Sequence, residues 1–294
     1  MNKVKILWQF SRPHTIIGSI CSIVALYIIA INGVNFGANI GVLFFTIIAG
    51  LACNVFIVGL NQIVDVEIDK INKPYLPLAA NTLSTKQANA IIYTCLVISL
   101  VVGYATSWVL GCLITIILII GIAYSLPPIQ LKKHHLPAAI CITVVRGLLV
   151  NIGMFLHFRY SIFNTPIQQP MPNYIWPLTF FIIAFSIAIA WFKDLPDTDG
   201  DSNFKIKTLA ILYSKKVAFI SGSIMVLGAY IYAIIWAGLA QQRFLFTSHL
   251  MLLGFFILNL FFVKLSSQSS IKQFYLRFWV FFFAEYILFS INFL

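Results

Sequence analysis

The sequence predicts an all-α integral membrane protein with nine transmembrane helices, and three observations lead to this fold class. First, 61% of the 294 residues are hydrophobic, 9% are charged and the mean hydropathy is +0.96, which is too apolar for a soluble domain. Second, the apolar residues form nine long runs. Third, the basic residues gather in alternate connections between these runs, as in a chain that crosses a membrane repeatedly.

Each apolar run is long enough for a membrane-spanning helix, which needs about 20 mostly apolar residues. Helices are favoured because each satisfies its backbone hydrogen bonds internally, whereas a β-barrel would show alternating strands of about ten residues. We expect one domain over residues 1–294, because no low-complexity linker interrupts the chain. The predicted spans lie near residues 14–31, 40–60, 88–107, 109–126, 137–157, 174–192, 217–237, 246–263 and 274–294.

The basic residues also predict the orientation. With a cytoplasmic N-terminus, 15 basic residues fall in cytoplasmic connections and two, Arg159 and Arg243, in the opposite ones. This asymmetry follows the positive-inside rule and places the C-terminus on the opposite side. The net charge of +11 then reflects topology and attraction to anionic lipid rather than nucleic-acid binding. The 15 residues are Lys3, Lys5, Arg12, Lys70, Lys73, Lys86, Lys132, Lys133, Lys193, Lys205, Lys207, Lys215, Lys216, Lys264 and Lys272.

The first apolar run is interpreted as a span rather than a cleaved signal peptide, because it lacks a clear small-residue cleavage site near Asn32 and Gly33. All five cysteines fall inside apolar segments without Cys-x-x-Cys spacing. We interpret them as small buried hydrophobic residues, and expect neither a disulfide nor a soft-metal site.

Seven of the eight acidic residues form two short clusters, NQIVDVEID and KDLPDTDGD, each directly after an apolar run. Both clusters contain Asp-x-x-x-Asp at the same offset, since Asp65 and Asp197, and likewise Asp69 and Asp201, are 132 residues apart. The equal offset suggests two pseudo-equivalent halves that deliver their clusters to one side of the membrane, from spans two and six.

The spacing within the first cluster predicts a shared helix face. Asn61, Asp65 and Asp69 lie at i, i+4 and i+8, so a continuous helix would project them from one side, about 6 Å apart along the axis. Glu67 would point elsewhere.

In the second cluster, Asp194, Asp197 and Asp201 lie at i, i+3 and i+7. Pro196 fits a first helical turn but not a helix interior, which places Asp194 on a loop or cap, and Gly200 further weakens the case for a continuous helix.

Carboxylate and amide oxygens in this arrangement favour magnesium, a hard cation that shares its coordination with substrate phosphates. Solvated loop acids would explain one cluster, but two clusters at matching spacing in a chain almost without other acids favour a metal site. A helix–loop–helix calcium site would need ligands over about twelve residues, which TDGD does not supply.

Lysines flank both clusters, with Lys70 and Lys73 after the first and Lys193, Lys205 and Lys207 around the second. They fit the positive-inside pattern, and beside a metal they would also bind phosphate oxygens. Acidic segments, metal and lysines above an apolar interior are what ionisation of an allylic diphosphate requires, because they neutralise the leaving pyrophosphate while the membrane accepts the isoprenoid tail.

The segments NQIVDVEIDKINKPYLPLAAN and KDLPDTDGD together resemble the motifs of UbiA-type intramembrane aromatic prenyltransferases. Within that family, NKPYLPLA, FSRPHTIIGS, AYSLPPIQLKK and ICITVVRGLLVNIGMFLH are similar to the homogentisate prenyltransferase branch, whose members make tocopherol and plastoquinone precursors. The similarity runs from about Phe10 to Tyr213, and the last three spans match only in hydrophobicity. It implies nine transmembrane helices around a central cavity, capped by cytoplasmic loops.

The resemblance also implies roles for individual residues. At position 62 the wider family usually has Asp, whereas glutamine, as in this chain, is common in the homogentisate branch. Asp199 departs from the branch pattern, so the resemblance assigns it no role. Asp65, Asp69, Asp197 and Asp201 are implied to be catalytic, and the expected diphosphate-binding residues are Lys73, Lys132, Lys193, Lys205 and Lys207. The implied Mg²⁺ ligands are Asn61, Asp65, Asp69, Asp194, Asp197 and Asp201.

The residues expected to bind the aromatic acceptor are Arg12, His14, Tyr124 and Arg146. Arg146 lies near the middle of the fifth span, where a charge should face a protein interior or a wet cavity. A structural role, such as pairing with Glu285 or capping carbonyl groups, is an open alternative for Arg146. A lipid-facing anchor is an open alternative for Arg12.

The expected reaction is Mg²⁺-assisted ionisation of a prenyl diphosphate, attack by the ring of homogentisate, and coupled decarboxylation. Phytyl, geranylgeranyl and solanesyl donors all stay possible, with phytyl favoured, and no protein partner is implied. One alternative is a sister enzyme that uses 4-hydroxybenzoate or a chlorophyllide as the acceptor. A cation transporter is a more remote alternative, since transporters usually place ionisable residues at mid-membrane.

Overall fold

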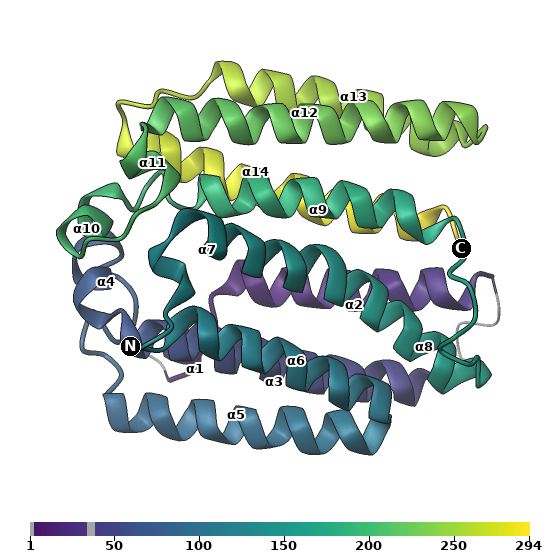
Figure 1. Cartoon of the computed structure of the whole chain (residues 1–294), viewed down its shortest axis with the longest axis horizontal. Helices are drawn as coiled ribbons and strands as arrows, with labels where there is room; N and C mark the ends of the chain where they lie inside the picture. Colours follow the sequence, from purple (N-terminus) through teal and green to yellow (C-terminus); the bar gives the residue numbers. More distant parts are fainter. Residues whose placement is uncertain (1–2, 34–38) are drawn as a thin grey trace.

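The computed structural model describes residues 3–33 and 39–294, and these residues contain nine helices long and apolar enough to cross a membrane, as the sequence predicts (Figure 1). The fifth span combines three helical segments, α7 (His135–Ile142), the π-helix η2 (Thr143–Gly153) and α8 (Met154–Phe163). The other eight are α2 (Pro13–Ile31), α3 (Ile40–Val64), α5 (Thr85–Thr106), α6 (Trp108–Ser125), α9 (Ile175–Phe192), α12 (Lys215–Leu239), α13 (Arg243–Phe261) and α14 (Gln268–Ile291).

Serine residues begin several of these helices. The Ser84 hydroxyl accepts from the Gln87 backbone N–H while the Gln87 side chain accepts from the Ser84 backbone N–H, which is a complete capping box. Ser107, Ser214 and Ser267 cap α6, α12 and α14 through their hydroxyl groups. The last span therefore begins at Gln268, six residues before the sequence-based boundary at 274.

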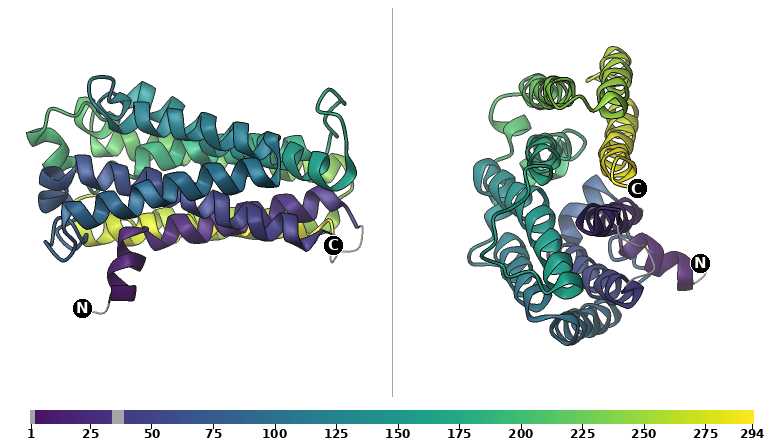
Figure 2. Two further views of the ribbon diagram at one scale, coloured as in Figure 1. Left: turned by 90° about the horizontal axis from the view of Figure 1, so that it is seen from below. Right: turned by 90° about the vertical axis from the view of Figure 1, so that its right-hand side faces the viewer.

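Six spans close a ring around the centre of the bundle. Going round the ring, α2 contacts α3, α3 contacts α6, α6 contacts the α7–η2–α8 span, this span contacts α9, α9 contacts α14, and α14 returns to α2. The remaining spans pack outside it, with α5 against α3 and α6, α12 against α9, and α13 between α12 and α14 (Figure 2). The ring is what leaves room for an internal cavity.

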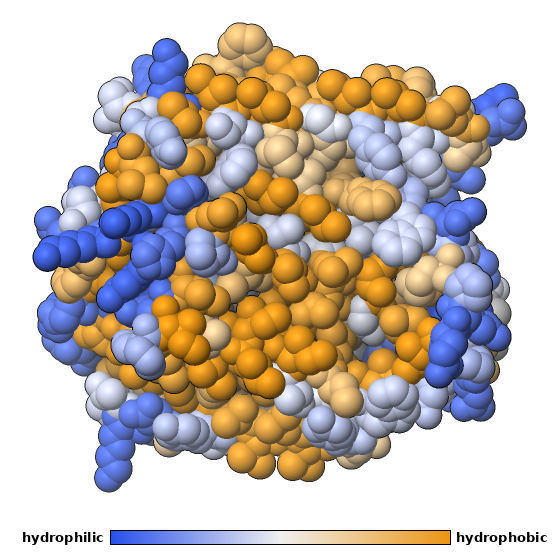
Figure 3. Space-filling view, viewed as in Figure 1, coloured by the Kyte–Doolittle hydropathy of each residue, from blue (hydrophilic) through white to orange (hydrophobic). Residues whose placement is uncertain are grey.

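The short helices lie together at one end of the bundle, which we call the cap end. They are α1 (Lys3–Phe10), α4 (Val66–Asn72), η1 (Leu131–Lys133), α10 (Thr198–Asn203) and α11 (Leu209–Leu212) (Figure 1). Helix α1 projects away from the bundle, as the left view of Figure 2 shows. In Figure 3 an apolar band covers the middle of the molecule and polar side chains gather at both ends, as expected for a bilayer-spanning surface.

The last two spans, α13 and α14, are joined by a buried polar contact. Nε2 of His249 on α13 lies 3.0 Å from Oε2 of Glu285 on α14, and both side chains are fully buried. The pairing of Arg146 with Glu285, one of the alternatives above, is therefore wrong. Arg146 packs against Trp279 and Phe282 of α14, the helix that carries Glu285, but helix packing gives Glu285 an imidazole partner from α13 instead.

A second buried histidine ties three spans together towards the end opposite the cap. Nε2 of His157 lies 2.8 Å from Oγ1 of Thr46 on α3, and Nδ1 lies 2.8 Å from Oγ of Ser107 at the start of α6. Because buried polar groups need partners, this contact fixes the positions of α3, α6 and α8 relative to one another.

Candidate active site

The two acidic clusters occupy equivalent positions in the fold. Asp65 ends α3 and precedes the short helix α4, and Asp197 follows α9 by a short loop and precedes the short helix α10. Their backbones are nearly identical, with φ −101° and ψ 15° at Asp65 and φ −101° and ψ 4° at Asp197. Helices α4 and α10 pack against each other, so the matching offset in the sequence corresponds to a matching pair of elements in space.

The prediction of one continuous helix from Asn61 to Asp69 is wrong. The helical dihedrals stop at Asp65, although the Asp65 N–H still donates to the Asn61 carbonyl (3.0 Å) and the Asp69 N–H to the Asp65 carbonyl (2.7 Å). The helix is therefore interrupted and the chain bends at Asp65, although these two backbone hydrogen bonds are kept. Neither proline nor glycine causes the bend, which occurs in the sparsely populated dihedral region where many active-site residues lie. The second cluster meets its expectation, since Asp194 lies in a loop after α9.

Asp69 and Asp201, four residues after Asp65 and Asp197, are both buried. Burial raises the pKa of Asp69 to about 6. Burial, together with the carboxylates of Asp197 and Asp194, raises the pKa of Asp201 to about 7. Oδ2 of Asp69 is buried and has no hydrogen-bond partner, which makes it an acceptor that a cation would satisfy.

Three lysines pair with three of the carboxylates. Nζ of Lys132 lies 2.5 Å from Oδ1 of Asp65, Nζ of Lys193 lies 2.5 Å from Oδ1 of Asp194, and Lys73 binds Asp197. Although burial opposes the charged form, the Asp197 carboxylate holds the pKa of Lys73 above its usual value. Burial lowers the pKa of Lys132, and the Asp65 carboxylate offsets this decrease only in part. These ammonium groups therefore point toward the carboxylates of the two clusters.

All these groups line one cavity of about 760 Å³ at the cap end, which we call the outer chamber. Its charged residues and expected metal ligands are Arg12, His14, Asn61, Asp65, Asp69, Lys73, Lys132, Lys193, Asp194, Asp197, Asp201 and Lys272. Every residue expected to bind metal is among them.

Lys205 and Lys207, expected to bind diphosphate, are not among the residues that line the chamber. Lys205 is the counterpart of Lys73 by the offset of 132, but α10 ends differently from α4. The backbone of Lys205 turns to φ 57° and its side chain is exposed. Lys207 bonds through its backbone to Lys133 and His135, and its side chain is also exposed.

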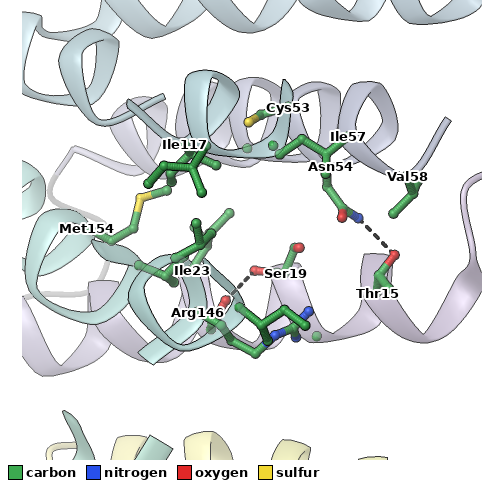
Figure 4. A pocket seen from close by; sticks show the side chains of 18 of the residues that line it. Thr15, Ser19, Ile23, Cys53, Asn54, Ile57, Val58, Ile117, Arg146 and Met154 are labelled. Atoms are coloured by element: carbon green, nitrogen blue, oxygen red, sulfur yellow. Dashed lines mark hydrogen bonds between the residues drawn. The ribbon is translucent and has the colours of Figure 1, made fainter. Parts of the chain in front are cut away.

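A second cavity of about 250 Å³ lies inside the ring of spans, and we call it the inner chamber (Figure 4). Tyr124 on α6 lines both chambers, so it stands at their junction. The inner chamber is mostly apolar, with Asn54, which donates to Thr15 at 3.1 Å, and Arg146 among its few polar residues. Its aliphatic lining includes Ile23, Ile57, Ile114, Ile117, Val150 and Met154.

Arg146 brings a positive charge to the inner chamber without an acidic partner among the described residues. Its guanidinium carbon lies 4.8 Å from the ring centroid of Trp279 and 5.4 Å from that of Phe282, and its Nε is buried without a hydrogen-bond partner. The Asn151 amide donates to the Arg146 carbonyl at 3.1 Å and itself accepts from Tyr286 at 3.0 Å, which holds this part of η2 in place.

Arg12 and His14 lie at the start of α2 and line the outer chamber. The ring of His14 lies 5.0 Å from that of Trp279. The structure thus separates the four residues expected to bind the acceptor, with Arg12 and His14 in the outer chamber, Arg146 in the inner one and Tyr124 between them.

Comparison with known proteins identifies the family. The model of the UbiA prenyltransferase family matches residues 19–284. The chain belongs to the UbiA prenyltransferase family. It is therefore a prenyltransferase, as the acidic motifs and the two chambers indicate.

Several named UbiA relatives are similar over nearly the whole chain. The chain is 43% identical to homogentisate phytyltransferase of Synechocystis sp., over 99% of its own length and 96% of the relative's. It is 36% identical to homogentisate phytyltransferase 1 of Arabidopsis thaliana, over 96% of the chain and 73% of the relative. It is 35% identical to homogentisate solanesyltransferase of the same plant, over 96% and 75%.

Solved structures of UbiA proteins share the fold. A UbiA homolog from Archaeoglobus fulgidus bound to GPP and Mg²⁺ gives a TM-score of 0.64 at 15% identity, over 96% of this chain and 99% of that one. The apo structure of a UbiA homolog from Aeropyrum pernix gives 0.66 at 15% identity, over 95% and 96%.

The donor set of the outer chamber fits the magnesium ion expected for a UbiA prenyltransferase. The acids and Asn61 offer only oxygen ligands, and Oδ2 of Asp69 has no other partner. In the described part of the chain, no three His, Cys, Asp or Glu side chains already converge on one point. Lys73, Lys132 and Lys193 hold three of the carboxylates in ion pairs.

Sequence reasoning missed three contacts in this UbiA site. The Asn72 amide bridges α4 and α10, and the Gln268 side chain at the start of α14 donates to the Pro196 carbonyl. Gln62, at the position where the wider family has an acid, is buried and donates to the Phe10 carbonyl at 2.6 Å, so it fastens α1 to α3. The NKPYLP segment, which contains Asn72, was the one sequence signal that could have led to the first of these.

Proposed function

We propose that the chain transfers a prenyl group from a prenyl diphosphate to homogentisate in an Mg²⁺-dependent reaction coupled to decarboxylation. The observation that carries the proposal is the outer chamber, which brings both Asp clusters and three lysines together directly above an apolar inner chamber. The donor proposed first is phytyl diphosphate, because the relative that is 43% identical is named as a phytyltransferase.

The charge of the outer chamber supports a metal–diphosphate substrate over a free cation. Five carboxylates line it, and five lysine or arginine side chains balance them: Arg12, Lys73, Lys132, Lys193 and Lys272. A site for cation transport would need a surplus of negative charge, whereas a nearly neutral lining suits a cation and an anion that bind together. This lining therefore disfavours the transporter alternative.

The roles of the residues follow from their positions. Asn61, Asp65 and Asp69 from one half and Asp194, Asp197 and Asp201 from the other would hold Mg²⁺. When bound, Mg²⁺ would supply positive charge that stabilises the pyrophosphate leaving group. Lys73, Lys132 and Lys193 would exchange their carboxylate partners for phosphate oxygens, which adds charge-assisted hydrogen bonds to the leaving group.

The transfer step then needs an apolar space and a positioned ring. The allylic C–O bond breaks with its electron pair going to pyrophosphate, and a ring carbon of the acceptor forms the new C–C bond and loses its proton. The acceptor's carboxylate leaves as CO₂, and the carbon that carried it takes up a proton. The inner chamber would shelter the prenyl chain from water, and the aromatic side chains around Tyr124 and Tyr275 would attract the carbocation.

The test is an assay of the purified protein with homogentisate, Mg²⁺ and a panel of phytyl, geranylgeranyl and solanesyl diphosphates. We expect pyrophosphate release and a prenylated product whose mass shows the loss of CO₂, with phytyl diphosphate used best. If 4-hydroxybenzoate is prenylated and homogentisate is not with any donor, the acceptor assignment is wrong while the family assignment stands.

A further inference from the structure

Asn72 connects the two Asp-bearing segments directly. It is the last residue of α4, it is buried, and its side chain reaches across to α10. Its Oδ1 accepts from the Gly200 backbone N–H at 2.8 Å, and its Nδ2 donates to Oδ1 of Asp201 at 3.3 Å. One amide thus bonds both the backbone of the second cluster and one of its carboxylates.

The fit between Asn72 and Gly200 leaves no room for a side chain on the glycine. A Cβ at Gly200 would lie 2.6 Å from the Cγ, Oδ1 and Nδ2 atoms of Asn72, closer than real Cβ contacts come. Gly200 is therefore required by close approach and not by its own dihedral angles. Gly200 is thus where α4 and α10 make close contact through the Asn72 side chain.

Only an amide satisfies both partners at this position. The Gly200 N–H needs an acceptor and the Asp201 carboxylate needs a donor, and an asparagine side chain offers one of each on the same amide group. An aspartate would keep the first bond but place a second negative charge against Asp201. A leucine of similar shape would lose both bonds and leave the buried N–H and carboxylate oxygen unsatisfied.

We propose that Asn72 is a positioning residue that sets the separation of the two Asp segments and orients the Asp201 carboxylate for the metal–diphosphate substrate. This inference rests on the proposed function, since it assigns Asn72 a role at the same site. Asn72 acts through Asp201 and Gly200 and does not itself react.

The experiment measures binding without turnover, using Mg²⁺ with inorganic pyrophosphate as the probe. Purified wild-type protein and the variants Asn72→Leu, Asn72→Asp and Gly200→Ala are titrated with the probe, and melting temperatures are recorded with and without it. The matched control is Asn203→Ala, because Asn203 is an exposed asparagine at the end of α10. We expect each of the three variants to bind the probe about ten- to a hundredfold more weakly, the range expected when a hydrogen bond to a charged group is lost.

The variants also separate positioning from simple stability. Asn72→Asp keeps the bond to Gly200, so the probe-free melting temperature should fall less than in Asn72→Leu, while pyrophosphate binding is weakened at least as much. Asn203→Ala should match the wild type in both measurements. In turnover assays the prenyl diphosphate KM should rise more than the acceptor KM.

Two outcomes would overturn the inference, and they are distinguishable. If Asn72→Asp and Gly200→Ala bind Mg²⁺–pyrophosphate as tightly as the wild type, Asn72 does not position the site although the proposed function stands. If the wild type itself shows no Mg²⁺-dependent pyrophosphate binding, the diphosphate site fails and the inference fails with it.

Discussion

Replacing Arg146 by Met should impair the use of homogentisate without impairing the use of the prenyl donor. Arg146 lines the inner chamber without an acidic partner in the described residues, and aromatic rings are its close contacts. A charge-assisted contact with the acceptor's carboxylate is worth about 1.5–3 kcal/mol. Its loss should lower kcat/KM for homogentisate by about ten- to a hundredfold. Arg12, by contrast, lies in the outer chamber among the acids and lysines, so Arg12→Met should mainly raise the KM of the prenyl diphosphate.

The substitution should not destabilise the fold. It removes cation–π contacts worth about 0.5–2 kcal/mol. It also removes a charge whose placement inside a membrane costs about 2.5–3.5 kcal/mol. The melting temperature should therefore stay the same or rise, so a loss of activity would not be a folding effect.

The assay varies each substrate while the other is saturating, and includes hydroquinone as an acceptor that has no carboxylate. Hydroquinone should react equally well with the wild type and with Arg146→Met, because there is no carboxylate contact to lose. If Arg146→Met impairs both acceptors equally, or leaves homogentisate unaffected, Arg146 does not bind the carboxylate.

Four further predictions concern the site, the fold and the topology. Asp65→Ala and Asp197→Ala should each abolish turnover, and the double variant should be little worse because the residues act as a unit. Glu67 is exposed and pairs with Lys70 at 2.7 Å, so Glu67→Ala should be tolerated. Turnover that persists in a chelator would contradict the metal site. Lys132→Met should lower kcat/KM for the prenyl diphosphate by about tenfold or more. Lys205→Met, at an exposed position outside the chamber, should leave it unchanged, and equal effects would show that lining the chamber does not decide which lysines bind the diphosphate. Glu285→Leu should destabilise the protein by about 3–5 kcal/mol in thermal or denaturant unfolding, since it leaves the buried His249 without its partner; a stability equal to wild type would show that the pair contributes little. A reporter fused after Leu294 should lie on the side opposite the cytoplasm, and cytoplasmic reporter activity would reverse the predicted orientation.

The nine spans and the location of the acidic clusters could be predicted from the sequence, because both depend on local composition. A run of about 20 apolar residues is compatible with little else than a membrane helix. The offset of 132 residues likewise indicates two matching segments, and α4 and α10 do contact each other. Glu67 points away from the site as predicted, since its side chain is exposed and does not line the outer chamber.

Spacing alone could not decide which charged side chains share a cavity, because that depends on the packing of segments far apart in the chain. Lys73 and Lys205 are equivalent by offset, yet Lys73 binds Asp197 while the backbone at Lys205 turns its side chain outwards. Arg146 and Glu285 are both charges within spans, yet they are not partners, because α13 brings His249 to Glu285 and the ring of spans leaves Arg146 facing the inner chamber. The amino-acid composition, the length of the apolar runs and the spacing of the acidic residues determined the helices and where their acids lie. The packing of those helices decided the bend at Asp65, the Asn72 contact and the separation of the two chambers.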